Sequence, residues 1–110
     1  MTIDHRLAVY GTLAPGRSNH RELAGLTGEW RTGRICGRLI AEGWAATEGY
    51  PAFFVDPLAP PIEIQLFESA DLPQHWRRLD AFEGPHYRRT AISVSIGDEM
   101  IEAWIYAAAG

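Results

Sequence analysis

Two segments far apart in the sequence carry the residue types that could do chemistry. The first is the run Val-Tyr-Gly-Thr-Leu at 9–13, in which an apolar stretch breaks at a glycine. Such a turn can aim successive backbone N–H groups at one point, which then binds a carboxylate or a polarised carbonyl oxygen. The second is Glu83, which directly precedes a Gly-Pro pair. An ordinary loop and a solvated carboxylate are the alternatives at these two places, and the residues alone slightly favour them.

Glu83 is the more informative of the two. The last turn of a helix presents negative partial charge, so the carboxylates of Asp80 and Glu83 are both mildly unfavourable there. Glu83 follows Phe82 on the apolar side of the expected helix, where desolvation would raise the pKa of its carboxyl group and make it a stronger base. Asp80 lies nearer the polar face. We expect it to anchor the turn or to pair with one of the arginines at 77–78 and 88–89.

Apolar runs bounded by Gly, Pro or Asp predict the strands that must position these segments. The expected strands are 7–10, 34–40, 50–55, 62–67, 87–96 and 100–107. The last two should form an antiparallel hairpin. Because the strands follow one another without long crossover helices, we expect an α+β fold, a small mixed β-barrel of about six strands with two short flanking helices.

Two short helices are expected to flank the strands. Asn19 with Glu22 predicts a capping box, which would open a helix that reaches about residue 26. Apolar residues at spacings of three and four predict a second helix that ends at Glu83, with Ser69 or Asp71 as its cap. The Gly-Pro pair that follows is a strong stop signal.

Composition bounds the class of protein. The 110 residues, 46% hydrophobic and 22% charged, predict one globular domain over 1–110. A net charge of −4 argues against a non-specific nucleic-acid or anionic membrane surface. The single cysteine, Cys36, is expected to be a small buried hydrophobe, and four histidines without ligand spacing predict no metal. No apolar stretch reaches the length of a signal peptide or a membrane span, so we expect a cytoplasmic protein.

Residues 11–18, Gly-Thr-Leu-Ala-Pro-Gly-Arg-Ser, also fit a phosphate-binding loop in which Arg17 replaces the lysine. We rank this nucleotide-binding interpretation low. The sequence lacks the repeated strand–helix units of such proteins, and a planar guanidinium is a poor substitute for a lysine enclosed by backbone amides.

Taken together, four stretches resemble the gamma-glutamylcyclotransferase-like family, especially its short gamma-glutamylamine cyclotransferase branch. They are V-Y-G-T-L-A-P-G-R-S-N-H at 9–20, the region 37–51 that leads into G-Y-P-A, L-D-A-F-E-G-P-H-Y-R-R at 79–89, and A-W-I-Y at 103–106. They span nearly the whole chain in the expected order. The first and third are specific when they occur together.

The resemblance implies a small mixed β-barrel and an internal cyclisation that needs no cofactor and no metal. A γ-glutamyl compound would release 5-oxoproline and an amine or amino acid. The resemblance places the catalytic carboxylate on Glu83 and the substrate-holding residues on Tyr10, Gly11, Thr12, Leu13 and Tyr87. We therefore expect a small-molecule substrate, no nucleic-acid or membrane partner, and a monomer or weak homodimer.

One strand departs from the family pattern. Where the family usually has Val-x-Gly-Glu, this chain reads Ile62-Glu63-Ile64-Gln65. The bulkier isoleucine and the uncharged glutamine are expected to alter the cavity wall, so the reaction type is better predicted than the substrate. The first alternative is a non-catalytic domain on the same scaffold that binds a small carboxylate. The second is nucleotide hydrolysis.

Overall fold

The computed structural model describes residues 2–10, 20–40 and 52–108. Its strands are β1 (Arg6–Val9), β2 (Glu29–Ile40), β3 (Ala52–Val55), β4 (Pro61–Glu68), β5 (Tyr87–Ile96) and β6 (Glu99–Ala108). Its α-helices are α1 (Arg21–Ala24) and α2 (Trp76–Glu83), with short 3-10 helices η1 (Ile3–His5) and η3 (Leu72–Gln74). The expected α+β fold, with about six strands and two short helices, is confirmed.

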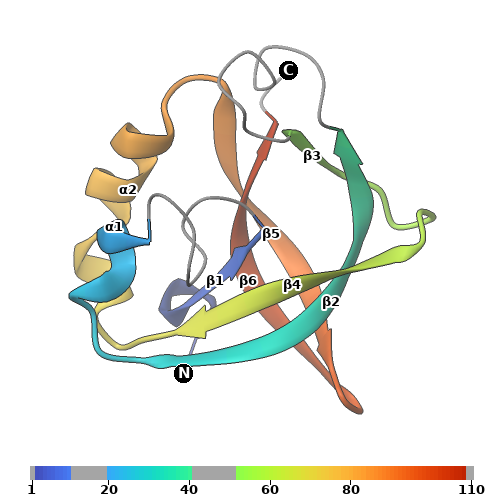
Figure 1. Cartoon of the computed structure of the whole chain (residues 1–110), viewed down its shortest axis with the longest axis horizontal. Coiled ribbons are helices and arrows are strands. Elements are labelled where there is room, and N and C mark those ends of the chain that lie inside the picture. Colours follow the sequence, from blue (N-terminus) through green and yellow to red (C-terminus); the bar gives the residue numbers. More distant parts are fainter. Residues whose placement is uncertain (1, 11–19, 41–51, 109–110) are drawn as a thin grey trace.

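Five of the strands close a mixed barrel. Their order is β2-β4-β1-β6-β5, and the ring closes where β5 returns to β2 at the pair Arg34↔Ser95. Neighbouring strands are antiparallel, except that β1 runs parallel to β6. Strand β3 pairs antiparallel with β2 and lies outside the ring. Figure 1 shows α1 and α2 together on one side of the barrel.

Alternation along the strands divides the buried apolar side chains into two sets. One set fills the barrel interior: Ala8, Ile35, Phe53, Ile64, Leu66, Ile92, Val94, Ala103, Ile105 and Ala107. The other set lies between the barrel wall and the helices. We call this layer the seam, and it consists of Leu7, Val9, Leu23, Phe67, Leu72, Trp76, Leu79 and Tyr106. The seam is what attaches α2 to the barrel.

The predicted C-terminal hairpin is confirmed. Strands β5 and β6 pair in register from Tyr87↔Ala108 to Ile96↔Glu99, which leaves a two-residue loop of Gly97 and Asp98. Gly97 has φ of 57°, whereas no non-glycine residue in the described ranges has a positive φ. Glycine first in a two-residue loop is typical of a type II′ turn, whose twist matches that of the strands.

Several predicted element boundaries are wrong. Strand β2 begins at Glu29, five residues before the expected start, because the ladder with β4 continues to the pair Glu29↔Glu68. Helix α1 ends at Ala24, and Asn19 of the predicted capping box lies outside the described residues. The single helix expected to end at Glu83 is divided by His75 into η3 and α2.

The predicted cap of that helix is also wrong. Asp71 and Ser69 both bind Thr27, which lies in the loop just before β2. The Thr27 backbone N–H donates to the Asp71 carboxylate over 2.8 Å, and the Ser69 hydroxyl donates to the Thr27 carbonyl. The two residues therefore join two loops instead of capping a helix.

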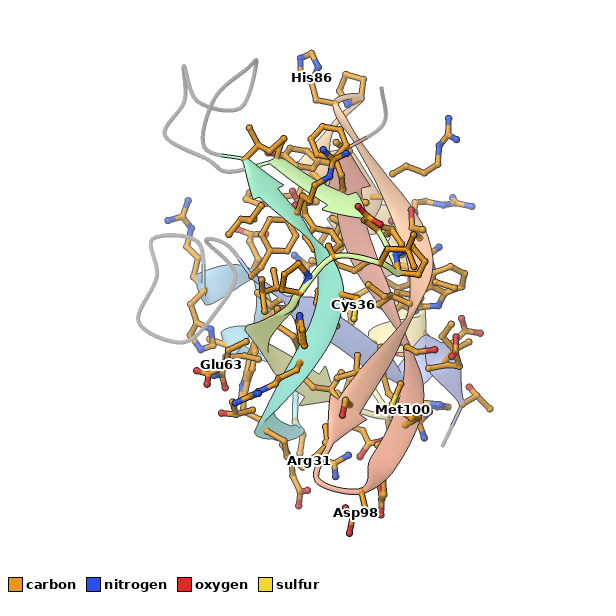
Figure 2. The ribbon with its side chains drawn as sticks, turned by 90° about the vertical axis from the view of Figure 1, so that its right-hand side faces the viewer. Arg31, Cys36, Glu63, His86, Asp98 and Met100 are labelled. Atoms are coloured by element: carbon orange, nitrogen blue, oxygen red, sulfur yellow. The ribbon has the colours of Figure 1, made fainter. Side chains whose placement is uncertain are left out.

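Cys36 is half-buried, not buried as predicted. Its neighbours Ile35 and Gly37 are buried, so alternation turns the cysteine to the outer face of β2. The labelled Cys36 can be followed on this strand in Figure 2.

Candidate active site

Glu83 is the last residue of α2, at one end of the barrel. Gly84 follows it with φ of 82°, a conformation that favours glycine, and donates its N–H to the Asp80 carbonyl over 3.1 Å. The chain then turns into β5 at Tyr87. Figure 2 shows His86, in this connection, at the end of the molecule opposite the hairpin residue Asp98.

The Glu83 carboxyl group is partly buried and has no hydrogen-bond or ion-pair partner among residues 2–10, 20–40 and 52–108. Desolvation by the surrounding protein raises its pKa from 4.5 to about 7. A carboxyl group with this pKa exchanges a proton readily at neutral pH, which is the property that a general acid–base catalyst needs.

Tyr10, directly after β1, lies at the same end of the barrel. Its hydroxyl donates to the backbone carbonyl of Tyr106 over 2.6 Å, and its ring packs against Phe53 with centroids 5.4 Å apart. Burial raises the pKa of the Tyr10 hydroxyl, and the charges of Tyr87 and Glu83 raise it further. The structure thus brings together three of the predicted site residues, Tyr10, Glu83 and Tyr87. The other three, Gly11, Thr12 and Leu13, lie outside the described residues.

Asp80, one turn before Glu83, has the anchoring role expected of it. Its carboxylate accepts a hydrogen bond from the Tyr106 hydroxyl over 2.7 Å and forms an ion pair with Arg89, whose Nε lies 3.0 Å from Oδ1. Two carboxylates in successive turns of α2 therefore have opposite environments. Asp80 is held by a cation and a hydroxyl, whereas Glu83 is desolvated and has no such partner in the part of the chain that the structure describes.

Sequence reasoning missed the aromatic residues around Arg89. Its guanidinium carbon lies 4.6 Å from the ring centroid of Trp76 and 4.7 Å from that of Trp104. Each indole N–H donates to Asp4 of η1, Trp76 to its carbonyl and Trp104 to its carboxylate. The four arginines near α2 were visible in the sequence, but only strand pairing reveals which of them faces the two tryptophans.

The described residues contain no group of three or more His, Cys, Asp or Glu side chains placed to hold a metal ion. Over the same residues, no helix is both long enough and apolar enough to cross a membrane.

Ile64 and Gln65, which depart from the family pattern, occupy opposite faces of β4. Ile64 is 2% exposed in the barrel interior, where it pairs with Gly33 of β2. A side chain at Gly33 would meet Val94 at 2.7 Å, so the glycine leaves room for the larger neighbours. The Gln65 amide donates to the Thr32 hydroxyl over 3.2 Å. The departure is thus accommodated within the packing of the barrel.

Comparisons with known proteins agree with this architecture. The family model described as gamma-glutamyl cyclotransferase, AIG2-like, matches residues 7–110. No curated protein matches the chain. Among solved structures, an AIG2-like protein of Mus musculus is similar to 96% of this chain over 77% of its own, with 23% identity and a TM-score of 0.71.

Bacterial and archaeal structures share the fold as well. YkqA of Bacillus subtilis is similar over 96% of this chain and 36% of its own, with 26% identity and a TM-score of 0.73. The protein PH0828 of Pyrococcus horikoshii is similar over 94% of this chain and 78% of its own, with 21% identity and a TM-score of 0.64. Because the family match extends from β1 to the end of the sequence, the chain belongs to the gamma-glutamyl cyclotransferase, AIG2-like family.

Proposed function

We propose that this protein is a γ-glutamyl cyclotransferase in which Glu83 carries the proton. It would convert a γ-glutamyl amine or γ-glutamyl amino acid into 5-oxoproline and the free amine or amino acid. The observation that carries the proposal is the environment of Glu83, a partly buried carboxyl group with a pKa raised to about 7, at the position that the family resemblance makes catalytic.

The reaction needs little beyond positioning and proton transfer. The α-amine nitrogen attacks the side-chain carbonyl carbon of the same glutamyl group, a C–N bond forms, and the bond to the leaving nitrogen breaks. The attacking ammonium group loses one proton before the attack and a second as it becomes the lactam N–H, and the leaving nitrogen gains two as it departs as an ammonium group, so the atoms balance without a co-reactant. Because the nucleophile and the carbonyl belong to the same glutamyl group, holding the substrate in a folded shape supplies much of the rate enhancement. Glu83 accepts a proton from the attacking nitrogen and delivers one to the leaving nitrogen, once for each of the two transfers.

We further propose that the turn at 10–13 holds the substrate. Backbone N–H groups of Gly11 to Leu13 would bind either the α-carboxylate or the oxyanion that develops on the carbonyl oxygen. Tyr10 supports this assignment by its position, because its side chain lies at the barrel end near Glu83 and Tyr87. Its hydroxyl is already committed to the Tyr106 carbonyl, so we assign Tyr10 to the wall of the site and not to proton transfer.

Replacing Glu83 with Gln tests the mechanism. With a panel of γ-glutamyl amines and dipeptides as substrates, kcat/KM for 5-oxoproline release should fall at least about 100-fold, because the amide cannot accept the proton. Glu63→Gln is the matched control, since Glu63, labelled in Figure 2, is an exposed glutamate on β4. Equal activity of the Glu83→Gln variant and the wild type would show that the mechanism is wrong.

The non-catalytic alternative rests on the departure at Ile64 and Gln65. A binding domain would show saturable binding of a small carboxylate, for example a γ-glutamyl compound followed by calorimetry, with no 5-oxoproline from any member of the panel. Turnover of a single panel member by the wild type would exclude it.

A further inference from the structure

The charge of Asp80 is taken up by two partners that come from different strands. Arg89 of β5 approaches both carboxylate oxygens, with Nε 3.0 Å from Oδ1 and a terminal nitrogen 3.4 Å from Oδ2. Tyr106 of β6 donates its hydroxyl to Oδ1 over 2.7 Å. Burial, together with this hydrogen bond to Asp80, raises the pKa of Tyr106, so the hydroxyl stays protonated as a donor.

Arg89 is held in place independently of Asp80. Its guanidinium group lies between the rings of Trp76 and Trp104, each less than 5 Å away, and its side chain is 24% exposed. Stacking of this kind orients a planar guanidinium as well as stabilising its charge. Since both indoles are themselves tied to Asp4, the cation is fixed to face Asp80 and does not swing freely towards the end of α2.

The groups around Glu83 can be named for each element near it. They are Asp80 on its own helix, Tyr10 after β1, Tyr106 on β6, and Tyr87 and Arg89 on β5. His86 and Arg88, its other close neighbours along the chain, are exposed to solvent. Asp80 lies three residues before Glu83, and residues so spaced in a helix are neighbours on its surface. An unpaired charge at Asp80 would therefore act directly on Glu83.

We propose that the cluster of Arg89, Asp80 and Tyr106 is a positioning device that keeps Glu83 as the single proton carrier of α2. The proposal rests on the proposed function only for the catalytic role of Glu83. Two uncompensated carboxylates at this spacing would compete for one proton and titrate as a coupled pair. Because the Asp80 carboxylate is paired with Arg89, the two charges together add little net field at Glu83, and desolvation is the cause that raises the pKa of Glu83.

Opposite charge changes at the two partners test this. Asp80→Asn leaves the Arg89 charge uncompensated and should lower the pKa of Glu83, whereas Arg89→Met leaves Asp80 uncompensated and should raise it. We expect each shift to be about half a pH unit or more, in opposite directions. The double variant removes both charges, so its Glu83 pKa should be close to that of the wild type. The measurement is the pH titration of the Glu83 side-chain carboxyl carbon by NMR, which requires no turnover.

A second readout uses activity. The acid limb of the pH profile of kcat/KM should move in the same directions as the NMR titration. Arg78→Gln is the matched control, because Arg78 also anchors α2 but pairs with Glu22 on α1, and it should leave both midpoints unchanged. Shifts of the same sign in the two single variants, or no shift in either, would overturn the proposal. Unchanged activity in Glu83→Gln with opposite NMR shifts would instead contradict only the proposed function. If Arg89→Met does not fold, the near-isosteric Asp80→Asn still tests the proposal, because its Glu83 pKa must be lower than that of the wild type.

Discussion

The barrel interior and the seam are both buried, yet they differ in what they bury. The interior cluster consists of apolar side chains from the strands, with Phe53 its largest member. The seam contains Trp76 and Tyr106, and Trp104 packs against it. Both indoles donate to Asp4, and the Tyr106 hydroxyl donates to Asp80. The interior thus supplies rigidity, while the aromatic residues in and beside the seam make polar contacts that orient α2 towards the candidate site.

The first way to test this contrast is to damage the interior. Ile64→Ala should lower the free energy of unfolding by about 2–5 kcal/mol, because it removes a buried side chain and leaves a cavity in a closed barrel. Chemical denaturation measures the loss. Val55→Ala, at a side chain that is 42% exposed, should change stability by less than about 1 kcal/mol. Equal losses at the two positions would show that the interior is not the rigid part.

The second test concerns the cost of burying the Glu83 carboxyl group at the end of α2. The pKa of Glu83 is about 7 in the folded protein and near 4.5 when unfolded, so the folded state holds the proton more tightly. Wild-type stability should therefore fall as pH rises from about 4.5 to about 7 and then level off. Glu83→Gln has no carboxyl group to ionise, so it avoids this loss of stability. It should be more stable than wild type at pH 8 by about 2–3 kcal/mol.

The same variant provides its own control at low pH. Below about pH 4.5, Glu83 is protonated in both states, so the difference between Glu83→Gln and wild type should vanish. Denaturation curves at pH 4 and pH 8 give the comparison. A difference that does not change with pH would mean that burial does not raise the pKa of Glu83.

The third test weakens the aromatic contacts beside the seam. Trp104→Phe removes the indole N–H that donates to Asp4 and one of the two large rings beside Arg89. We expect a loss of about 1–2 kcal/mol in the free energy of unfolding, the size of one hydrogen bond and part of a cation–π contact. The control is Met100→Leu, an exposed position on the same strand, which should leave stability unchanged.

The smallest effect is expected on the outer surface of α2. Arg78→Gln breaks the 2.9 Å ion pair with Glu22 that joins the two helices. Because the Arg78 side chain is 42% exposed, the loss should be below about 1 kcal/mol, and high salt should reduce it further. A larger loss that is insensitive to salt would mean that the helices are joined by surface contacts as much as by the seam.

The sequence was a good guide to the type of each element and a poorer guide to its limits. Apolar alternation correctly predicted the hairpin of β5 and β6, and the Gly-Pro stop signal correctly predicted the end of α2 at Glu83. It missed residues 29–33 of β2, because Trp30 and Arg31 have no distinctive strand pattern and are strand residues only through their partners on β4. The cap predicted at Ser69 or Asp71 failed for a similar reason, since the better partner, Thr27, is distant in sequence.

For the candidate site, local rules proposed that Glu83 is desolvated and that Asp80 is anchored, because a helix end on an apolar face imposes both tendencies. The two rings and the hydroxyl that secure this difference come from α2 and β6, the arginine comes from β5, and no local pattern associates them. The sequence by itself therefore determined which residue could hold a proton. Only the tertiary structure decided which arginine neutralises its neighbour, because the pairing of β5 with β6 and the packing of α2 place Arg89 between Trp76 and Trp104.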